Sequence, residues 1–317
     1  MNNNHNKKFR GVVVPMVTPT NPTGSLDEPA AGRLIDSLLR AGVDGVFVLG
    51  TTGEAASVPR SVRMRLVEYS SKRVNGKVPL YAGINDNCLR DVIETGNQYL
   101  RAGADAVVAL PPSYFPIQRR EMLQYFSELL DQMNGPVILY NMPSTTHLSI
   151  PIEVIEELVG HPRLAGLKDS EDNGSRLEKL VRQLGSRADF SIFIGVGTWM
   201  AKMLPLGADG IVPSAGNLAP GLCCRLYERA RAGHQPEAEQ LEQQLSAVVK
   251  LYQRGRTLGE SLAALKAAMS FRGLCQPDVF PPLLPLSGRE RNDLGRELAR
   301  LDIPELLGEC KRDLQLA

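Results

Sequence analysis

The chain has 317 residues, of which 43% are hydrophobic, a formal net charge of +1 and an isoelectric point of about 7.6. This balance gives no strong field for nucleic acid or an anionic membrane surface, so we expect neither as a partner. No apolar run approaches the roughly 20 residues of a membrane-spanning helix. The five cysteines lack a C-x-x-C spacing, and the start "MNNNHNKKFR" lacks an apolar signal segment. We therefore expect reduced thiols in a soluble, cytoplasmic protein.

Three similar phrases mark buried strands along the chain. "AGVDGVFVLG" begins at residue 41, "AGADAVVALPP" at residue 102 and "LGADGIVPSAG" at residue 206. Each has the pattern of a helix end, a glycine (Gly42, Gly103 or Gly207), a short polar turn and an apolar strand. The glycines are 61 and 104 residues apart. Since a βα unit of a barrel takes about 30 residues, these spacings predict strands two, four and eight of such a barrel.

Five further apolar runs supply the remaining strands. They lie at residues 11–19, 78–84, 135–141, 164–168 and 190–195. Between the strands, helical patterns occupy residues 59–74, 118–131 and 151–160. Strands that are almost wholly apolar and alternate with helices are typical of a parallel sheet that is covered on both faces.

The sequence therefore predicts an α/β fold, a (β/α)8 TIM barrel followed by a C-terminal helical domain. We expect a disordered polar N-terminus at residues 1–9, the catalytic barrel at 10–218 and the helical domain at 219–317. Helices of that domain are predicted near 219–231, 235–252, 258–271 and 289–300. An open doubly wound sheet is the alternative, but no G-x-G-x-x-G follows the first strand.

A lysine ends the sixth predicted strand. The stretch "RLAGLKDSEDNG" (residues 163–174) places Lys168 directly after an apolar run. Active residues of a barrel lie at the C-terminal ends of its strands. Burial among apolar side chains disfavours the charged form of an amine, and a neutral amine can attack a carbonyl to form a Schiff base. The alternative is a lysine that extends from the strand end into solvent.

Two tyrosines and a glycine lie at other strand ends. Tyr140 ends strand five in "YNMPSTTH", where a phenol can transfer a proton or simply pack at the strand end. Tyr114, in "PPSYFP" after strand four, is either a second such phenol or an aromatic of a turn or interface. Gly216, in "PSAGN" after strand eight, either admits a ligand close to the backbone or forms a tight turn.

The segment "GTTGEAAS" (residues 50–57) follows the second strand. Gly50 and Gly53 would let successive N–H groups converge on a carboxylate, with the hydroxyls of Thr51 and Thr52 as further donors. The alternative is a helix start that one of the threonines caps, with Glu54 in the first turn. Both interpretations are compatible with each other.

Metal and cofactor sites are not predicted. The four histidines are scattered, and the chain has no H-x-x-x-H and no Cys/His cluster. It also has no Walker loop and no nicotinamide fingerprint. We therefore expect a reaction that needs neither a metal nor a cofactor.

Five motifs together resemble those of a known family. "GTTGEAASV", "LPPSYFP", "YNMPS", "GLKDS" and "GADGIVPSAGN" are similar, in order and spacing, to the dihydrodipicolinate synthase / N-acetylneuraminate lyase (DapA-like) family of class I Schiff-base aldolases. The resemblance runs from about residue 10 to about residue 300. It implies a TIM barrel with a C-terminal helical domain, a homotetramer or dimer of dimers, and an imine with pyruvate or another 2-keto acid.

The resemblance also implies roles for the residues singled out above. Lys168 would form the imine, and Tyr140 would shuttle the proton and contribute to the site of the substrate carboxylate. Thr51 and Thr52 would hold that carboxylate, with Thr51 also in the proton relay. Tyr114 would complete the relay by reaching into the site of a neighbouring subunit.

Two further positions concern the substrate. Ile211, in the last strand, would lie beside the pyruvyl group. Dihydrodipicolinate synthases usually carry an arginine after the Pro-Ser of "YNxPS", where this chain has Thr145, and His147 stands where glycine is usual. A threonine cannot make the bidentate charged contact of an arginine with an acidic aldehyde. We therefore expect Thr145 and His147 to face a hydroxylated or less charged aldehyde part.

The predicted function is a Schiff-base-forming lyase or aldolase that adds the pyruvate enamine to an aldehyde or cleaves a 2-keto-3-deoxy acid. The alternatives are a 2-keto-3-deoxy sugar-acid dehydratase, a 4-hydroxy-tetrahydrodipicolinate synthase, which Thr145 disfavours, and a non-catalytic keto-acid sensor. A barrel enzyme that uses phosphate or metal is a further class, which the absence of the corresponding motifs disfavours.

Overall fold

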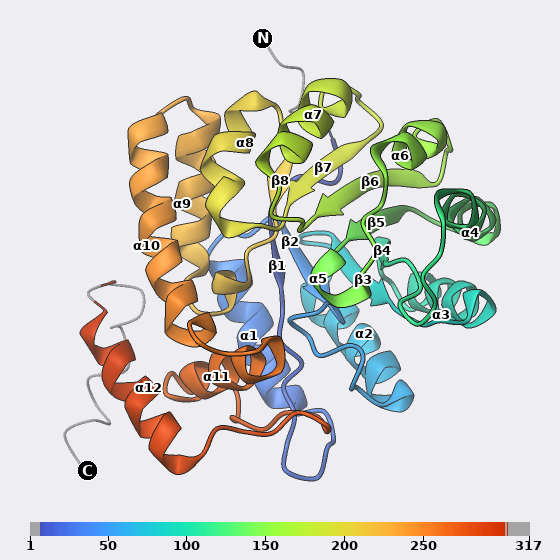
Figure 1. The fold of residues 1–317 in the computed structure, drawn as a ribbon. Coiled ribbons are helices and arrows are strands. Elements are labelled where there is room, and N and C mark those ends of the chain that lie inside the picture. The colour runs from blue at the N-terminus through green and yellow to red at the C-terminus, as the bar shows by residue number, and fades with distance from the viewer. Residues whose placement is uncertain (1–6, 302, 304–317) are drawn as a thin grey trace.

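A closed barrel of eight parallel strands forms the centre of the molecule in the computed structural model, which describes residues 7–301 and residue 303 (Figure 1). The strands follow one another around the barrel in chain order, and β8 closes it against β1. Their bounds are Gly11–Pro15 (β1), Gly45–Val48 (β2), Leu80–Ile84 (β3), Ala106–Ala109 (β4), Val137–Asn141 (β5), Leu164–Asp169 (β6), Ser191–Ile194 (β7) and Gly210–Ile211 (β8). The predicted TIM barrel is confirmed.

Helices surround the barrel on its outside (Figure 1). They are Glu28–Arg40 (α1), Arg60–Val74 (α2), Leu89–Arg101 (α3), Arg119–Gln132 (α4), Ile152–Leu158 (α6), Gly174–Leu184 (α7), Met200–Leu206 (α8) and Pro220–Arg231 (α9). The short helix Pro143–Thr146 (α5) follows β5 at the C-terminal end of the barrel. Short 3-10 turns follow β7 at Gly197–Trp199 and β8 at Ser214–Asn217. The predicted glycines Gly42, Gly103 and Gly207 adopt φ values of 81°, 101° and 121°, which other residues rarely adopt, at the ends of α1, α3 and α8.

The last three helices form an extension beside the barrel (Figure 1). They are Gln235–Gln253 (α10), Leu258–Ser270 (α11) and Gly288–Arg300 (α12), close to the bounds predicted for the C-terminal helical domain. Helix α9 contacts α8 and β1, as expected of the helix that covers the eighth strand. We therefore propose that the helical extension begins after α9 rather than at residue 219.

The core has two layers because side chains of a strand alternate between its two faces. The inner layer fills the barrel with mainly large side chains, among them Phe47, Tyr81, Ile138 and Phe193. The much larger outer layer packs the strands against the helices. Both faces of each strand are therefore apolar, which explains the uniform apolar runs in the sequence.

The N-terminal end of the barrel is closed by residues that the sequence analysis assigned to a disordered terminus. Residues 1–6 of that segment lie outside the described residues. Lys7 is buried, forms an ion pair with Asp209 at 2.7 Å and donates to the carbonyl oxygen of Phe190 at 2.9 Å. Phe9 is also buried and packs edge to face on Tyr81. Lys7 and Phe9 are therefore held by the N-terminal end of the barrel, one through its ion pair and one through its ring contact.

Strand β1 is shorter than the predicted 11–19 and ends at Pro15. Beyond it the chain leaves the sheet, because its polar groups bind neighbouring loops. The N–H of Val17 donates to Asn217 Oδ1 at 3.0 Å, and Thr18 Oγ1 donates to the carbonyl oxygen of Gly53 at 2.6 Å. These residues therefore support the loops at the C-terminal end of the barrel.

Among the described residues, no helix combines the length and apolarity that crossing a membrane requires. Cys88, Cys223, Cys224 and Cys275 are free thiols, and only Cys88 of these is exposed. Cys310 lies outside the described residues.

Candidate active site

Tyr140 and Lys168 lie side by side at the C-terminal ends of β5 and β6. They are register partners in the sheet, and both side chains point into the barrel because both residues occupy inward-facing positions of their strands. Lys168 is 6% exposed and Tyr140 is 3% exposed. The lysine Nζ lies 3.9 Å from the centroid of the Tyr140 ring and 5.2 Å from that of Phe47. The structure thus supports a buried lysine and not one that extends into solvent.

Lys168 has no carboxylate partner among the residues that the structure describes. The other two buried lysines, Lys7 and Lys266, each form an ion pair. No carboxylate of the described residues therefore holds the Lys168 amine, which leaves its nitrogen available to a bound carbonyl compound.

The Tyr140 hydroxyl lies 3.4 Å from Thr51 Oγ1, at the long end of the hydrogen-bond range. Burial by itself raises the pKa of Tyr140. The charge of Lys168 and hydrogen bonds with Thr51 and Ser170 outweigh that effect, so the pKa of this phenol lies below its ordinary value of 10.0. A phenol with a lowered pKa gives up its proton more readily, which suits a proton shuttle.

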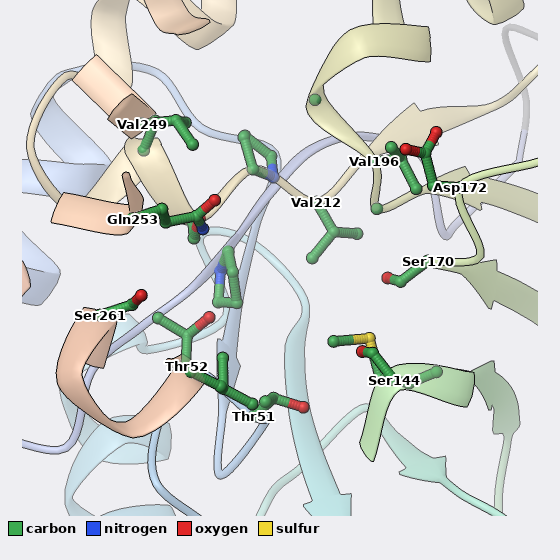
Figure 2. A pocket seen from close by; sticks show the side chains of 18 of the residues that line it. Thr51, Thr52, Ser144, Ser170, Asp172, Val196, Val212, Val249, Gln253 and Ser261 are labelled. Carbon is green, nitrogen blue, oxygen red and sulfur yellow. The ribbon is translucent and has the colours of Figure 1, made fainter. Parts of the chain in front are cut away.

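A cavity of about 550 Å³ opens over Lys168 and Tyr140. Figure 2 shows Thr51 and Thr52 on one side of it and Ser144, Ser170 and Asp172 on the other. Val249, Gln253 and Ser261 reach it from α10 and α11, so the helical extension supplies one wall (Figure 2). The sequence analysis missed this wall, because nothing local in a helix tells which distant loop it covers.

The segment 50–57 is a loop of turns, and α2 begins only at Arg60. The alternative of a helix start capped by a threonine is therefore wrong. Within the described part of the chain, the backbone N–H groups of Thr51 and Thr52 have no protein acceptor, whereas those of Gly53, Glu54 and Ala55 bond back to Gly50 and Thr51. The two N–H groups are free to bind a ligand.

The glycines of this segment serve packing and not the turn itself. The residues with positive φ are Leu49 and Glu54, at 58° and 57°. A Cβ on Gly50 would lie 2.8 Å from the Phe47 ring, and one on Gly53 would lie 3.0 Å from the carbonyl oxygen of Met16. Both positions therefore need the smallest residue because of close neighbours.

The last strand presents Val212, and not Ile211, to the cavity. Ile211 is fully buried in the outer layer, while Val212 belongs to the inner layer and lines the cavity (Figure 2). Adjacent residues of an extended chain point to opposite faces, so only one of the two side chains can face the barrel interior. The side chain that faces the cavity here is thus that of Val212, one position after the predicted Ile211.

Thr145 lines a neighbouring cavity of about 430 Å³, which Thr51 also borders. Its Oγ1 donates to the carbonyl oxygen of Met142 at 3.2 Å, and the short helix α5 turns it away from Lys168. His147 is exposed with φ 59° and lines neither cavity. Ser144 takes the place at the rim of the main cavity that was predicted for Thr145.

Tyr114 lies away from the other predicted residues and is 76% exposed. Its ring packs edge to face on Phe115, which is also exposed, and its N–H donates to Asn87 Oδ1 at 2.9 Å. In the single chain, Tyr114 therefore contacts neither Thr51 nor Tyr140.

Gly216 packs against Val14, where a Cβ would lie 2.6 Å from a methyl group, so close packing explains this glycine.

A polar network lies directly beside Tyr140 and Lys168 in the sheet. Asn141 and Asp169, the neighbours of Tyr140 and Lys168, are also register partners and form a hydrogen bond of 3.0 Å. Arg176 pairs with Asp169 at 2.9 Å. Burial raises the pKa of the Asp169 carboxyl, and the Arg176 charge opposes this rise. These residues have no signal in the sequence beyond their position next to the predicted pair.

The single tryptophan lies at the edge of the cavity. Trp199 Nε1 donates to Asp172 Oδ1 at 2.7 Å, and its ring packs where a side chain on Gly174 would otherwise lie. Asp172 itself lines the cavity.

Within the described residues, no three His, Cys, Asp or Glu side chains come together as a metal site would require.

Comparison with known proteins gives consistent results. Residues 8–301 match the profile of the Dihydrodipicolinate synthetase family. An uncharacterized DapA-like lyase of Thermococcus kodakarensis is 32% identical over 92% of this chain and 98% of its own. The putative 2-dehydro-3-deoxy-D-gluconate aldolase YagE of Escherichia coli is 28% identical, over 93% and 98% of the two chains.

Solved structures agree with this assignment. A dihydrodipicolinate synthase of Bacteroides thetaiotaomicron superposes with a TM-score of 0.88 at 31% identity, over 93% of this chain and all of the other. YagE in complex with pyruvate superposes with a TM-score of 0.86 over 92% of this chain and 98% of its own. Because the family profile spans nearly the whole chain, the protein belongs to the dihydrodipicolinate synthetase family.

Proposed function

We propose that this protein is a class I lyase or aldolase in which Lys168 forms an imine with pyruvate or a related 2-keto acid. The observation that carries the proposal is the buried Lys168 amine, which no carboxylate of the described residues binds, beside Tyr140 at the floor of a cavity on the C-terminal face of the barrel. YagE, which has been solved with pyruvate, supports the choice of the keto acid.

The first half of the reaction follows from the positions of four residues. The keto-acid carboxylate binds the free N–H groups and the hydroxyls of Thr51 and Thr52. The neutral Lys168 Nζ attacks the C2 carbonyl, and the oxygen takes up a proton to give a carbinolamine. Tyr140 then donates a proton to the leaving hydroxyl, water departs, and a protonated imine remains. Tyr140 is left as a phenolate, which the Thr51 hydroxyl contacts.

The second half uses the imine as an electron sink. The Tyr140 phenolate takes a C3 proton from the pyruvyl imine, which gives an enamine. The enamine C3 attacks the carbonyl carbon of an aldehyde, and Tyr140 protonates the alkoxide that forms. Hydrolysis of the new imine releases the product and regenerates Lys168. The reverse sequence cleaves the C3–C4 bond of a 2-keto acid.

The cavity suits a hydroxylated aldehyde better than an acidic one. No arginine is among the described residues that line it, so a bidentate contact with a second carboxylate is missing. Ser144, Thr198 and Gln253 instead offer neutral hydrogen-bonding groups at its rim. The name of YagE, a 2-dehydro-3-deoxy-D-gluconate aldolase, fits this class, and we propose a 2-keto-3-deoxy sugar acid as the substrate.

We further propose a cytoplasmic homotetramer or dimer of dimers. Tyr114 and Phe115 form an exposed aromatic pair of the kind that interfaces cover. In such an assembly Tyr114 would complete the proton relay of a neighbouring subunit.

Borohydride reduction in the presence of pyruvate, followed by peptide mapping, tests the proposal. We expect one reduced adduct, on Lys168, and none in Lys168→Met. Lys250 is an internal control, because it lines the same cavity but is exposed. Equal labelling of Lys250 and Lys168, or no adduct with the folded protein, would contradict the imine mechanism and leave a non-catalytic keto-acid sensor if pyruvate still binds.

The substrate is tested by a screen for pyruvate release. We expect 2-keto-3-deoxy sugar acids to be cleaved and aspartate semialdehyde to be a poor partner in the reverse direction. Efficient condensation with aspartate semialdehyde would instead identify a 4-hydroxy-tetrahydrodipicolinate synthase. Loss of water from a sugar acid without carbon–carbon cleavage would identify a dehydratase.

A further inference from the structure

A second buried lysine joins the helical extension to the loop that carries the two threonines. Lys266 lies in α11 within the apolar stretch "LAALKAAM", and its side chain has no exposed surface. Its Nζ lies 2.5 Å from Glu54 Oε1 and donates a hydrogen bond to the carbonyl oxygen of Asp278 at 2.9 Å. A lysine among alanines and leucines has no role in packing the helix, so its partner explains its presence.

Glu54 is held in a backbone conformation that its residue type rarely adopts. Its φ is 57°, in the left-handed region, which has a free-energy cost that surrounding contacts must outweigh. Its second oxygen, Oε2, accepts the N–H of Phe280 at 2.8 Å. Both carboxylate oxygens thus bind residues beyond α10, although Glu54 itself belongs to a loop of the barrel.

The contacts of Glu54 continue to Thr51. The Glu54 N–H donates to the carbonyl oxygen of Thr51 at 3.1 Å, and from the other side Thr18 Oγ1 holds the carbonyl oxygen of Gly53. The contact between Thr51 and Tyr140 is already long, at 3.4 Å. A small displacement of Glu54 would therefore separate these two hydroxyls and redirect the free N–H groups.

We propose that Glu54 and Lys266 are positioning residues, whose buried ion pair fixes segment 50–57 so that Thr51 meets Tyr140 and the segment's free N–H groups face the cavity. Desolvation of two buried charges largely offsets their attraction, so such a pair is a poor source of stability. Selection of one loop conformation is the use that the geometry supports. The expected effect on the rate of imine formation rests on the proposed function, whereas the expected effect on the conformation of segment 50–57 does not.

The chain offers a matched control at the opposite end of the barrel. Lys7 and Asp209 form an ion pair of 2.7 Å whose side chains are 4% and 1% exposed, against 0% and 1% for Lys266 and Glu54. Asp209 precedes β8 at the N-terminal end of the barrel and lines neither of the two cavities. Loss of this pair removes a similar buried contact without touching segment 50–57.

The test compares the double variants Glu54→Gln/Lys266→Met and Lys7→Met/Asp209→Asn, in which neither partner is left as an unpaired charge. Hydrogen exchange of the peptide that spans residues 49–58 is the first readout, and it needs no substrate. We expect faster exchange of this peptide in the Glu54/Lys266 variant and wild-type exchange in the control. The rate of borohydride trapping with pyruvate is the second readout, and we expect it to fall about 10- to 100-fold in the first variant only.

Glu54→Asp keeps the charge and is the second variant if the double variant fails to fold. Its shorter side chain reaches Lys266 less well, so we expect a smaller increase in the exchange of peptide 49–58 and a smaller decrease in the trapping rate. We also expect a higher half-saturating pyruvate concentration. Unchanged exchange at 49–58, or equal losses in the two double variants, would overturn the inference. If the wild-type protein gives no adduct at all, the proposed function fails, but the exchange comparison still decides the role of the pair.

Discussion

The Nζ atom of Lys168 lies over the ring of Tyr140, its register partner on the adjacent strand, 3.9 Å from the ring centroid. Because backbone pairing sets this separation, the two groups keep their geometry without a mobile loop. Two reacting groups on neighbouring strands of a parallel barrel also approach the cavity from the same side. The arrangement is the reason that we assign the proposed proton transfer to the Tyr140 hydroxyl and not to that of another tyrosine.

Tyr140→Phe should lower the rate of imine formation by about 10²- to 10⁴-fold while the fold remains, because the ring is kept and only the proton donor is lost. Stopped-flow or quenched borohydride trapping measures this rate. Tyr81→Phe is the matched control, because Tyr81 is similarly buried in the inner layer and its hydroxyl has no hydrogen-bond partner among the described residues. Equal rates in the Tyr140 variant and the wild type would remove Tyr140 from the mechanism.

The lowered pKa of Tyr140 should be visible in a spectroscopic titration. We expect one phenol of the folded protein to ionise below pH 10.0, and this step should be absent in Tyr140→Phe. The activity should decline over the same range, since the phenolate can no longer donate a proton. A titration of the wild type without any step that the variant lacks would show that the charge of Lys168 does not act on this phenol.

Arg176→Met should destabilise the protein by about 3–5 kcal/mol, because it leaves the buried carboxylate of Asp169 without its partner. Urea unfolding at neutral pH measures the change. Arg182→Met is the control, because Arg182 pairs with Glu178 on the exposed face of α7, where we expect no measurable change. Similar unfolding midpoints for the two variants would show that the polar network behind the active site contributes little.

Stability should fall as the pH rises above about 9. Burial raises the pKa of Cys275, Cys224 and Tyr99 to about 12. A group whose pKa is higher in the folded than in the unfolded protein stabilises the folded state. This contribution is complete at a pH below the unfolded pKa. It falls by about 1.4 kcal/mol per pH unit for each group as the pH rises towards the folded pKa. Urea midpoints between pH 7 and pH 10.5 test this, and Cys275→Ala should reduce the slope. A flat profile would contradict it.

Tyr114→Ala should weaken the assembly and the activity together. Tyr114 is exposed in the chain and touches no residue of its own cavity, so a change there affects catalysis only through a neighbouring subunit. Sedimentation velocity and the trapping rate measure the two effects. Leu284→Ala is the control, since Leu284 is similarly exposed, at 79%, but lies in the C-terminal extension. Full activity with an unchanged sedimentation coefficient would contradict the proposed interface role.

The barrel could be predicted because its strands are apolar on both faces and its turns repeat, as at Gly42, Gly103 and Gly207. Because both faces of each strand are apolar, the sequence did not show which side chains point into the barrel. In a strand with alternating polarity the inward face is readable, but Ile211 and Val212 are both apolar and β8 is only two residues long. The strand-end positions of Lys168 and Tyr140 could be predicted because each ends an apolar run with a polar group.

The remaining parts of the site depend on contacts between distant segments. The pairing of Glu54 with Lys266, 212 positions further along the chain, leaves only one trace in the sequence, a lysine within an apolar helix. The wall that Gln253 and Ser261 provide leaves none. Thr145 was misplaced because the short helix α5, which turns it aside, has too few residues for a recognisable pattern.

Trp199 has an optical consequence. Because it is the only tryptophan, emission excited at long ultraviolet wavelength comes from one indole, whose N–H is bound to a carboxylate at the cavity rim. A ligand that reorients Asp172 changes the polarity around that indole and shifts its emission. The protein therefore carries its own fluorescent reporter, with which candidate keto acids and aldehydes can be titrated before any turnover assay exists.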